Sequence, residues 1–180
     1  MRIISGIFRG RLIRPPAGFK ARPTTDFAKE SLFNILSNQY DFEELDVLDL
    51  FSGTGSISYE FASRGARSVV SVELAPSHFR FIQETCRALG LEQISPVRTD
   101  AFRYLMKPYL SFDVIFADPP YDHPRLEELP DLVLSTNILE AGGLFILEHP
   151  GNHDFSAHTG FSQHRKYGGV NFTFFRNNRS

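Results

Sequence analysis

The chain has 180 residues, of which 42% are hydrophobic and 22% are charged, with one cysteine and a formal net charge of −2. No stretch approaches the roughly 18 consecutive apolar residues of a membrane span, a single cysteine excludes an internal disulfide or a cysteine-built zinc cluster, and Arg9 and Arg11 precede any apolar run typical of a secretory signal. We therefore expect one cytoplasmic domain over residues 1–180, with a substantial hydrophobic core and no membrane partner.

The first 22 residues predict a small basic extension ahead of a core that spans residues 23–180. Residues 2–5 and 8–14 are short β-prone runs around Gly6, which indicates a hairpin, and two prolines and a glycine follow it. Basic blocks at chain ends are typical of nucleic-acid-binding arms, although an ordinary solvated face has the same composition. The candidate RNA-binding residues are Arg2, Arg9, Arg11, Arg14 and Arg22.

The rest of the chain alternates between helical and strand patterns. Thr24 or Thr25 can cap a helix that ends near Asn38, and a second helix is predicted to start at Pro76 and to end just before Gly90. Residues 158–167 and 170–176 predict a terminal antiparallel hairpin. Strand and helix alternation predicts an α/β fold, a parallel sheet with helices on both faces. The predicted strands are Val47–Phe51, Ser68–Glu73, Ile94–Thr99, Phe112–Ala117 and Gly143–Glu148.

A glycine-containing turn follows the first predicted strand and indicates a nucleotide-type cofactor site. Paired glycines let the backbone turn tightly and approach a ligand at the carboxyl edge of a sheet, although Ser58 at the third-glycine position disfavours NAD. Glu73, twenty residues after Gly53, can accept hydrogen bonds from both ribose hydroxyls of an adenosyl group. Asp100 can hold an adenine amino group beneath the ring of Phe102, or simply cap the next helix. The candidate cofactor-binding residues are Asp49, Phe51, Gly53, Gly55, Glu73, Asp100 and Phe102.

The tetrapeptide Asp118-Pro119-Pro120-Tyr121 follows the fourth predicted strand and is the candidate catalytic turn. Each proline fixes φ and lacks an N–H, so the turn is stiff and rich in hydrogen-bond acceptors. Asp118 and a neighbouring carbonyl can accept both hydrogens of an aromatic amine, while Tyr121 offers a face on which its ring can stack. An in-line methyl transfer needs mainly positioning, so no metal is expected, and the six histidines show no ligand-set spacing.

These motifs together resemble the bacterial small-subunit (16S) ribosomal RNA guanine-N2 methyltransferases of the D type. The resemblance covers nearly the whole chain and includes Arg22-Pro23-Thr24-Thr25-Asp26 with Lys29-Glu30-Ser31-Leu32-Phe33-Asn34, besides the glycine turn and the candidate catalytic turn. It implies a Rossmann-like methyltransferase sheet with an antiparallel seventh strand and S-adenosylmethionine as cofactor. It also implies methylation of guanine N2 in small-subunit ribosomal RNA, within an assembling ribosomal particle. We expect the enzyme to act as a monomer.

Three other functions are compatible with the same sequence. Relatives with the same tetrapeptide methylate adenine or cytosine amines in DNA, and the base identity comes from the family resemblance alone. A non-catalytic RNA-binding assembly factor could keep the fold without turnover. An oxidoreductase on the same fold is the third alternative.

Overall fold

The computed structural model describes residues 1–19, 25–106 and 110–179, and it contains five α-helices, two short 3-10 helices and seven strands within them. The helices are α1 (Asp26–Ser37), η1 (Phe42–Glu44), α2 (Ser56–Ser63), α3 (Pro76–Leu89), α4 (Ala101–Leu105), η2 (Leu126–Glu128) and α5 (Leu129–Ser135). The strands are β1 (Asp46–Leu50), β2 (Ser68–Val72), β3 (Ile94–Val97), β4 (Phe112–Ala117), β5 (Leu139–His149), β6 (Phe161–Tyr167) and β7 (Val170–Arg176). No helix in these ranges is both long and apolar enough to cross a membrane.

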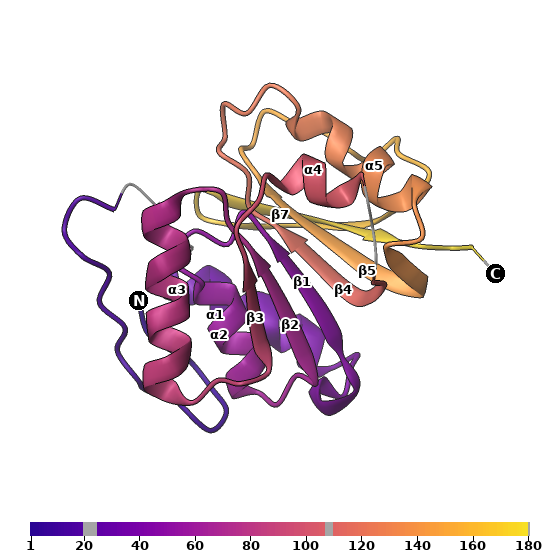
Figure 1. Cartoon of the computed structure of the whole chain (residues 1–180). Coiled ribbons are helices and arrows are strands. Elements are labelled where there is room, and N and C mark those ends of the chain that lie inside the picture. The colour runs from indigo at the N-terminus through magenta and orange to yellow at the C-terminus, as the bar shows by residue number, and fades with distance from the viewer. Residues whose placement is uncertain (20–24, 107–109, 180) are drawn as a thin grey trace.

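All seven strands form one mixed sheet in the order β3-β2-β1-β4-β5-β7-β6 (Figure 1). The first five strands pair in parallel, and β7 pairs antiparallel with both β5 and β6. The strand order reverses direction between β1 and β4, which is where ligands bind in sheets of this kind. The predicted α/β fold with an antiparallel C-terminal hairpin is therefore confirmed.

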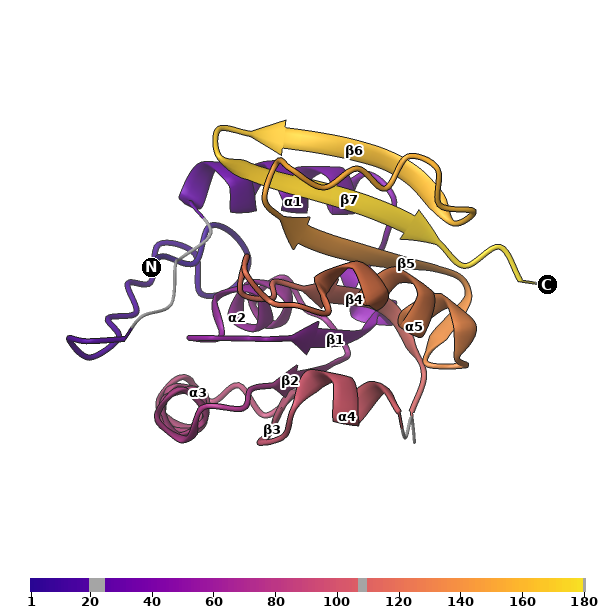
Figure 2. The ribbon, with the colours of Figure 1, turned by 90° about the horizontal axis from the view of Figure 1, so that it is seen from above.

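Helices cover both faces of the sheet and bury two hydrophobic clusters. Figure 2 shows α1, α2 and α3 on one face, with α4 and α5 on the other. Because successive strand side chains point to opposite faces, Val47 packs in the cluster under the first three helices, while Leu48 packs in the cluster under the other two. Because β1 is a central strand that is buried on both sides, its apolar residues Val47, Leu48 and Leu50 are divided between the two clusters.

The helix boundaries follow the predicted capping signals. The Thr25 hydroxyl accepts a hydrogen bond from the Ala28 amide at 3.1 Å, which caps α1. Pro76 occupies the first turn of α3, and Gly90 ends this helix with a left-handed φ of +65° that favours glycine. The other cap candidate, Thr24, lies outside the described residues.

Strand ends differ from the prediction at the N-terminal segment and at β5. The predicted N-terminal hairpin forms no regular strands and has one antiparallel bridge between Arg2 and Leu12, with the Ile3 amide donating to the Arg11 carbonyl at 3.0 Å. Its backbone also bonds to α2, since the Ile7 amide donates to the Ser63 carbonyl at 2.8 Å. β5 begins at Leu139, four residues before the predicted start, and its pairing with β4 is irregular in this region. Its early part is glycine-containing and exposed, so it has no apolar signature.

A buried ion pair holds the N-terminal segment, residues 1–13, against α1 and α2. Lys29 on α1 lies 3.8 Å from Glu60 on α2, and both side chains are at most 1% exposed. The Lys29 ammonium donates to the Arg2 carbonyl at 2.6 Å, and the Glu60 carboxylate accepts from the Ile4 and Ser5 amides at 2.8 and 3.0 Å. Burial lowers the pKa of Lys29. The segment is therefore fixed by specific polar contacts with the core.

Candidate functional site

A cavity of about 730 Å³ lies at the carboxyl edge of the parallel strands, and loops that follow β1 to β4 line it together with the end of β5. Its wall contains nine of the eleven candidate cofactor-binding and catalytic residues: Asp49, Phe51, Gly53, Glu73, Asp100, Asp118, Pro119, Pro120 and Tyr121. The other two, Gly55 and Phe102, are not part of the wall. The fold thus brings together residues from four separate segments of the sequence.

The glycine turn between β1 and α2 is built from left-handed backbone. Gly53 and Gly55 have φ values of +54° and +83°, and Phe51 has a φ of 58°, the only positive value at a non-glycine position in the described ranges. A Cβ atom on Gly55 would lie 2.6 Å from Cζ of Tyr59, so the close approach of this ring requires glycine. Gly55 therefore packs against Tyr59 on the side of the turn away from the cavity, while Gly53 lines the cavity.

Glu73 joins the loops that follow β1 and β2. Its Oε2 accepts a hydrogen bond from the Gly53 amide at 2.8 Å, and its Oε1 accepts one from the Ala75 amide at 2.7 Å. His78 Nδ1 lies 3.9 Å from Oε1. Because a carboxylate has about four acceptor positions, these two bonds fix its orientation while the side chain still lines the cavity.

Asp49 is the buried acid of the site. Its Oδ2 accepts hydrogen bonds from the Ser58 amide at 3.1 Å and from the Ser58 hydroxyl at 2.5 Å. Burial raises the pKa of Asp49 to about 7, while the hydrogen bonds from Ser58 oppose this rise. Asp49 therefore connects the end of β1 to the first turn of α2 and titrates near neutral pH.

Asp100 and Phe102 have different positions relative to the cavity. Asp100 lines it and caps α4, because its Oδ1 accepts from the Arg103 amide at 2.9 Å. Phe102 is buried beneath other side chains, with its ring stacked on His123 at a centroid distance of 5.0 Å and with the Arg125 guanidinium 4.1 Å from its centroid. The aromatic ring that lines the cavity in this region is His123, which sequence reasoning did not single out.

The candidate catalytic turn starts directly beside the glycine turn. The Asp118 amide donates to the Leu50 carbonyl at 3.3 Å, so the ends of β4 and β1 are joined. Pro119 is buried and Pro120 is exposed, while Asp118 and Tyr121 are partly buried. The Tyr121 hydroxyl donates to Oε1 of Glu148 at 3.2 Å.

Glu148, at the end of β5, is the functional candidate that sequence reasoning missed. It lines the cavity and is only 3% exposed. Its signal in the sequence is its position, since Glu148 is the last residue of the predicted strand Gly143–Glu148 and Asp118 directly follows the predicted strand Phe112–Ala117. Only the pairing of Ala117 with Leu147 in β4 and β5 shows that the two acids follow neighbouring positions of the sheet.

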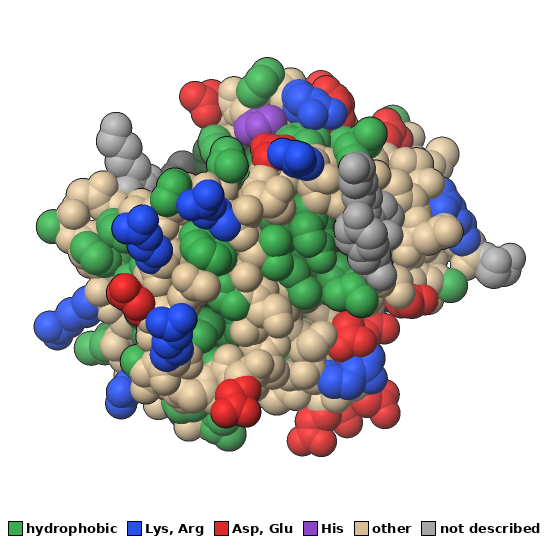
Figure 3. All heavy atoms as spheres, viewed as in Figure 1, with side chains coloured by type: hydrophobic (Ala, Val, Ile, Leu, Met, Phe, Trp, Pro, Cys, Tyr) green, Lys and Arg blue, Asp and Glu red, His purple; other side chains and the backbone are tan. Residues whose placement is uncertain are grey.

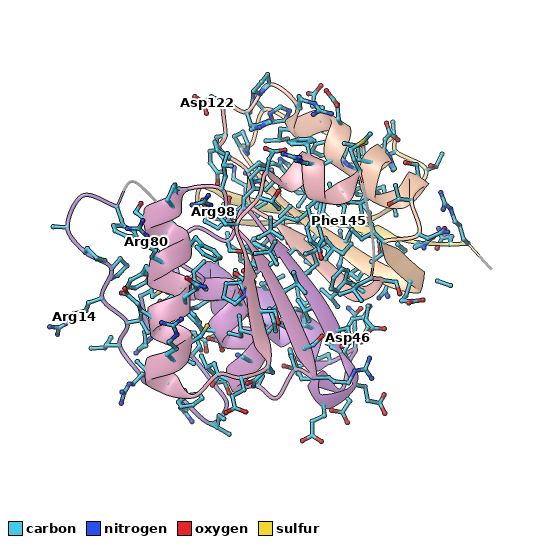
Figure 4. The ribbon with its side chains drawn as sticks, viewed as in Figure 1. Arg14, Asp46, Arg80, Arg98, Asp122 and Phe145 are labelled. Carbon is cyan, nitrogen blue, oxygen red and sulfur yellow. The ribbon has the colours of Figure 1, made fainter. Side chains whose placement is uncertain are left out.

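The basic candidates lie outside the cavity. Arg2, Arg9, Arg11 and Arg14 are all exposed, and Arg2 forms an ion pair with Asp26 at 3.3 Å. Figure 4 shows Arg14 pointing away from the molecule, and Figure 3 shows Lys and Arg side chains gathered over the N-terminal segment and α3. The fifth candidate, Arg22, lies outside the described residues. Within residues 1–19, 25–106 and 110–179, no group of three or more His, Cys, Asp or Glu side chains could hold a metal ion.

Comparison with known proteins gives a family, a relative and a solved structure that each match most of the chain. The family described as Conserved hypothetical protein 95 matches residues 1–176. A relative from Haemophilus influenzae, named Ribosomal RNA small subunit methyltransferase D, is 32% identical over 152 residues, covering 82% of this chain and 78% of the relative. The solved structure of a hypothetical protein from Thermus thermophilus has a TM-score of 0.86 and 31% identity, covering 97% of this chain and 98% of that one.

A more distant structure shares the fold alone. It is an RNA methyltransferase from Salinibacter ruber in complex with S-adenosyl-L-homocysteine, with a TM-score of 0.70 and 14% identity, covering 88% of this chain and 95% of that one.

Proposed function

The chain belongs to the family described as Conserved hypothetical protein 95, and we propose that it methylates the exocyclic N2 amino group of a guanine in small-subunit ribosomal RNA. The methyl donor is S-adenosylmethionine. The enzyme works in the cytoplasm as a monomer, on a partly assembled ribosomal particle. The name of the Haemophilus influenzae relative supports ribosomal RNA as the substrate class.

The cavity residues fit an adenosyl cofactor. The Glu73 carboxylate, held by two backbone amides, has acceptor positions left for the two ribose hydroxyls. Asp100 uses Oδ1 to cap α4, so Oδ2 is suited to the adenine amino group. Gly53 adds no side chain where the ligand passes the first loop. When bound, S-adenosylmethionine supplies an activated methyl group on a positively charged sulfur.

The observation that carries the proposal is the position of the Asp118–Tyr121 turn within the same cavity as Glu73 and the glycine turn. Asp118 and a backbone carbonyl of this turn accept the hydrogens of the target amine, which favours the more pyramidal nitrogen of the transition state. Tyr121 stacks on the base. Asp118 would also accept the proton that the nitrogen loses when it is methylated.

The substrate is a guanine in a loop or bulge of folded RNA. N2 lies on the paired edge of a guanine in a duplex, so the base must be unpaired or flipped to reach Tyr121, and loops present such bases at the smallest energetic cost. The described residues form one sheet with its helices, without a separate module that could read a long sequence. We infer that the folded shape around the target provides the specificity.

A direct transfer assay tests this function. Purified protein and cofactor carrying a labelled methyl group are offered naked small-subunit RNA, protein-bearing small-subunit particles and duplex DNA. The expected result is label in the particles, localised to N2 of one guanine. Preferential labelling of DNA would favour a DNA amino-methyltransferase, and binding to particles without any transfer would favour an assembly factor.

A further inference from the structure

We propose that Glu148 recognises the ring N1–H of the target guanine, so that Asp118 and Glu148 together select a base whose amino group lies next to a ring N–H donor. This inference rests on the proposed guanine-N2 methylation. It adds the residue that sets the identity of the base.

The two acids lie next to each other because of the sheet register. Ala117 at the end of β4 pairs with Leu147 of the adjacent parallel strand β5, so Asp118, directly after β4, and Glu148 in β5 each follow a paired residue. Neighbouring strands lie about 5 Å apart. Both acids line the same cavity.

The position of Glu148 is well fixed. Glu148 is 3% exposed and accepts a hydrogen bond from the Tyr121 hydroxyl at 3.2 Å. Its strand is clamped between β4 and β7, where Glu148 pairs with Phe172. The following residue, His149, is held by hydrogen-bonding contacts of its ring with the Pro150 carbonyl at 2.8 Å and the Thr173 hydroxyl at 2.7 Å. A side chain on such a rigid strand can discriminate between bases more precisely than one on a loop.

The chemistry of the base edges distinguishes guanine from the other amino-bearing bases. In guanine the N2 amine and N1–H are adjacent donors, and a carboxylate is an acceptor that matches a donor. In adenine and cytosine the ring nitrogen next to the amine is itself an acceptor. Two neighbouring acids would therefore place acceptor against acceptor for those bases, which is a repulsive element that rejects the wrong substrate.

The test compares guanine with 2-aminopurine at the target position. 2-Aminopurine keeps the 2-amino group but has an acceptor at N1, and it can be introduced by ligating small-subunit RNA from two pieces. The wild-type enzyme should prefer guanine by at least about tenfold in kcat/KM. Glu148→Gln should lower kcat/KM for guanine by about tenfold, because the charged acceptor for N1–H becomes a weaker neutral one. It should leave 2-aminopurine unchanged or improved, because the Gln amide can donate to N1.

The ratio of kcat/KM for guanine to kcat/KM for 2-aminopurine distinguishes recognition of the base by Glu148 from support of Tyr121. 2-Aminopurine also lacks O6, but the wild type and the variants all meet this difference, so it cancels when their ratios are compared. If Glu148 served only to hold Tyr121, Glu148→Gln and Tyr121→Phe would lower kcat/KM equally for both substrates. An unchanged ratio in Glu148→Gln would thus overturn the inference, as would a wild-type enzyme that does not discriminate, a result that needs no variant to fold.

Failure of the inference can be distinguished from failure of the proposed function. Wild-type methylation of guanine N2 with no change of selectivity in Glu148→Gln would exclude only the role of Glu148. Wild-type methylation of a different base would overturn both. Calorimetric binding of S-adenosylmethionine and thermal unfolding of Glu148→Gln should match the wild type, so that a loss of selectivity reports on the base.

Discussion

Asp118 is the single residue on which the proposed chemistry depends most. Asp118→Ala removes the acceptor for the target amine, and we expect kcat to fall by at least about 100-fold, since loss of one preorganised polar group typically costs this much. Binding of S-adenosylmethionine, measured by calorimetry, should stay within about threefold of the wild type. Asp122→Asn, an exposed acid in the same loop, is the matched control and should keep full activity. Full turnover by Asp118→Ala would exclude its role.

Asp49 predicts a pH-dependent stability. Its pKa is about 7 in the folded chain, against 3.8 for an ordinary aspartate, so between pH 3.8 and 7 the folded state binds more protons than the unfolded state. The contribution of Asp49 to the free energy of unfolding is therefore fully present below pH 4. It is lost as the pH rises through 7, which lowers the stability by up to about 4 kcal/mol. Asp49→Asn keeps an acceptor for Ser58 without the titration. Urea unfolding at several pH values should show a steeper decline from pH 4 to pH 8 in the wild type than in this variant, and parallel curves would contradict the assignment.

At the residue scale, the sequence predicted which acids line the cavity better than it predicted which aromatic rings do. Asp49, Glu73, Asp100 and Asp118 all line the cavity, because the carboxyl ends of parallel strands meet at one edge. Phe102 lies behind His123, and this could not be predicted because the ring order depends on how the loop after β4 folds over α4. The role of Glu148 requires the β4–β5 pairing, which no local pattern contains.

At the scale of elements, the buried contact between α1 and α2 controls how the N-terminal segment is held. Lys29→Met leaves Glu60 buried without its cation from α1, and breaking such a pair typically costs about 3 to 5 kcal/mol. Arg64, 2.9 Å from Glu60, keeps one partner, so we expect the lower end of this range. Urea unfolding measures the loss, and limited trypsin digestion should cut faster at Arg9 and Arg11.

Glu30→Met is the matched control for Lys29→Met, because Glu30 is the next residue on the same helix and is exposed. It should leave both the free energy of unfolding and the digestion rate nearly unchanged. Equal effects of the two substitutions would contradict a specific role for the buried pair.

The elements that could be predicted are those with strong local signals. The boundaries of α3 follow from Pro76 and Gly90, and the buried strands follow from their apolar runs. The N-terminal segment could not be predicted in detail, because some of its amides bond to Glu60 and to Ser63 on α2 and not within the segment. Contacts between segments some 55 residues apart leave no periodic pattern in the sequence.

At the scale of the whole molecule, the distribution of charge predicts how RNA binds. Arg2, Arg9, Arg11 and Arg14 are exposed on the N-terminal segment, and Figure 4 shows Arg80 on the side of the molecule where Figure 3 shows basic groups gathered. Replacing the four N-terminal arginines with glutamine should flatten the slope of log affinity against log salt concentration by about 0.7 for each phosphate that is no longer neutralised. Filter binding of small-subunit RNA at several salt concentrations measures this slope.

The control for the salt experiment uses a basic residue outside both the N-terminal segment and α3. Arg67, just before β2, is exposed and lies at the amino edge of the sheet. Replacing it with glutamine should leave the slope unchanged. If the N-terminal substitutions also left it unchanged, the segment would be an ordinary solvated surface.

The most direct test of the central proposal is a comparison of methylated nucleosides in small-subunit ribosomal RNA from cells with and without this protein. The RNA is digested to nucleosides and analysed by mass spectrometry, and the modified position is mapped. We predict that deletion removes one N2-methylguanosine, that the wild-type gene restores it, and that the Asp118→Ala gene does not. An unchanged set of methylated nucleosides after deletion would contradict the proposed function, and restoration by the Asp118→Ala gene would contradict the role of Asp118.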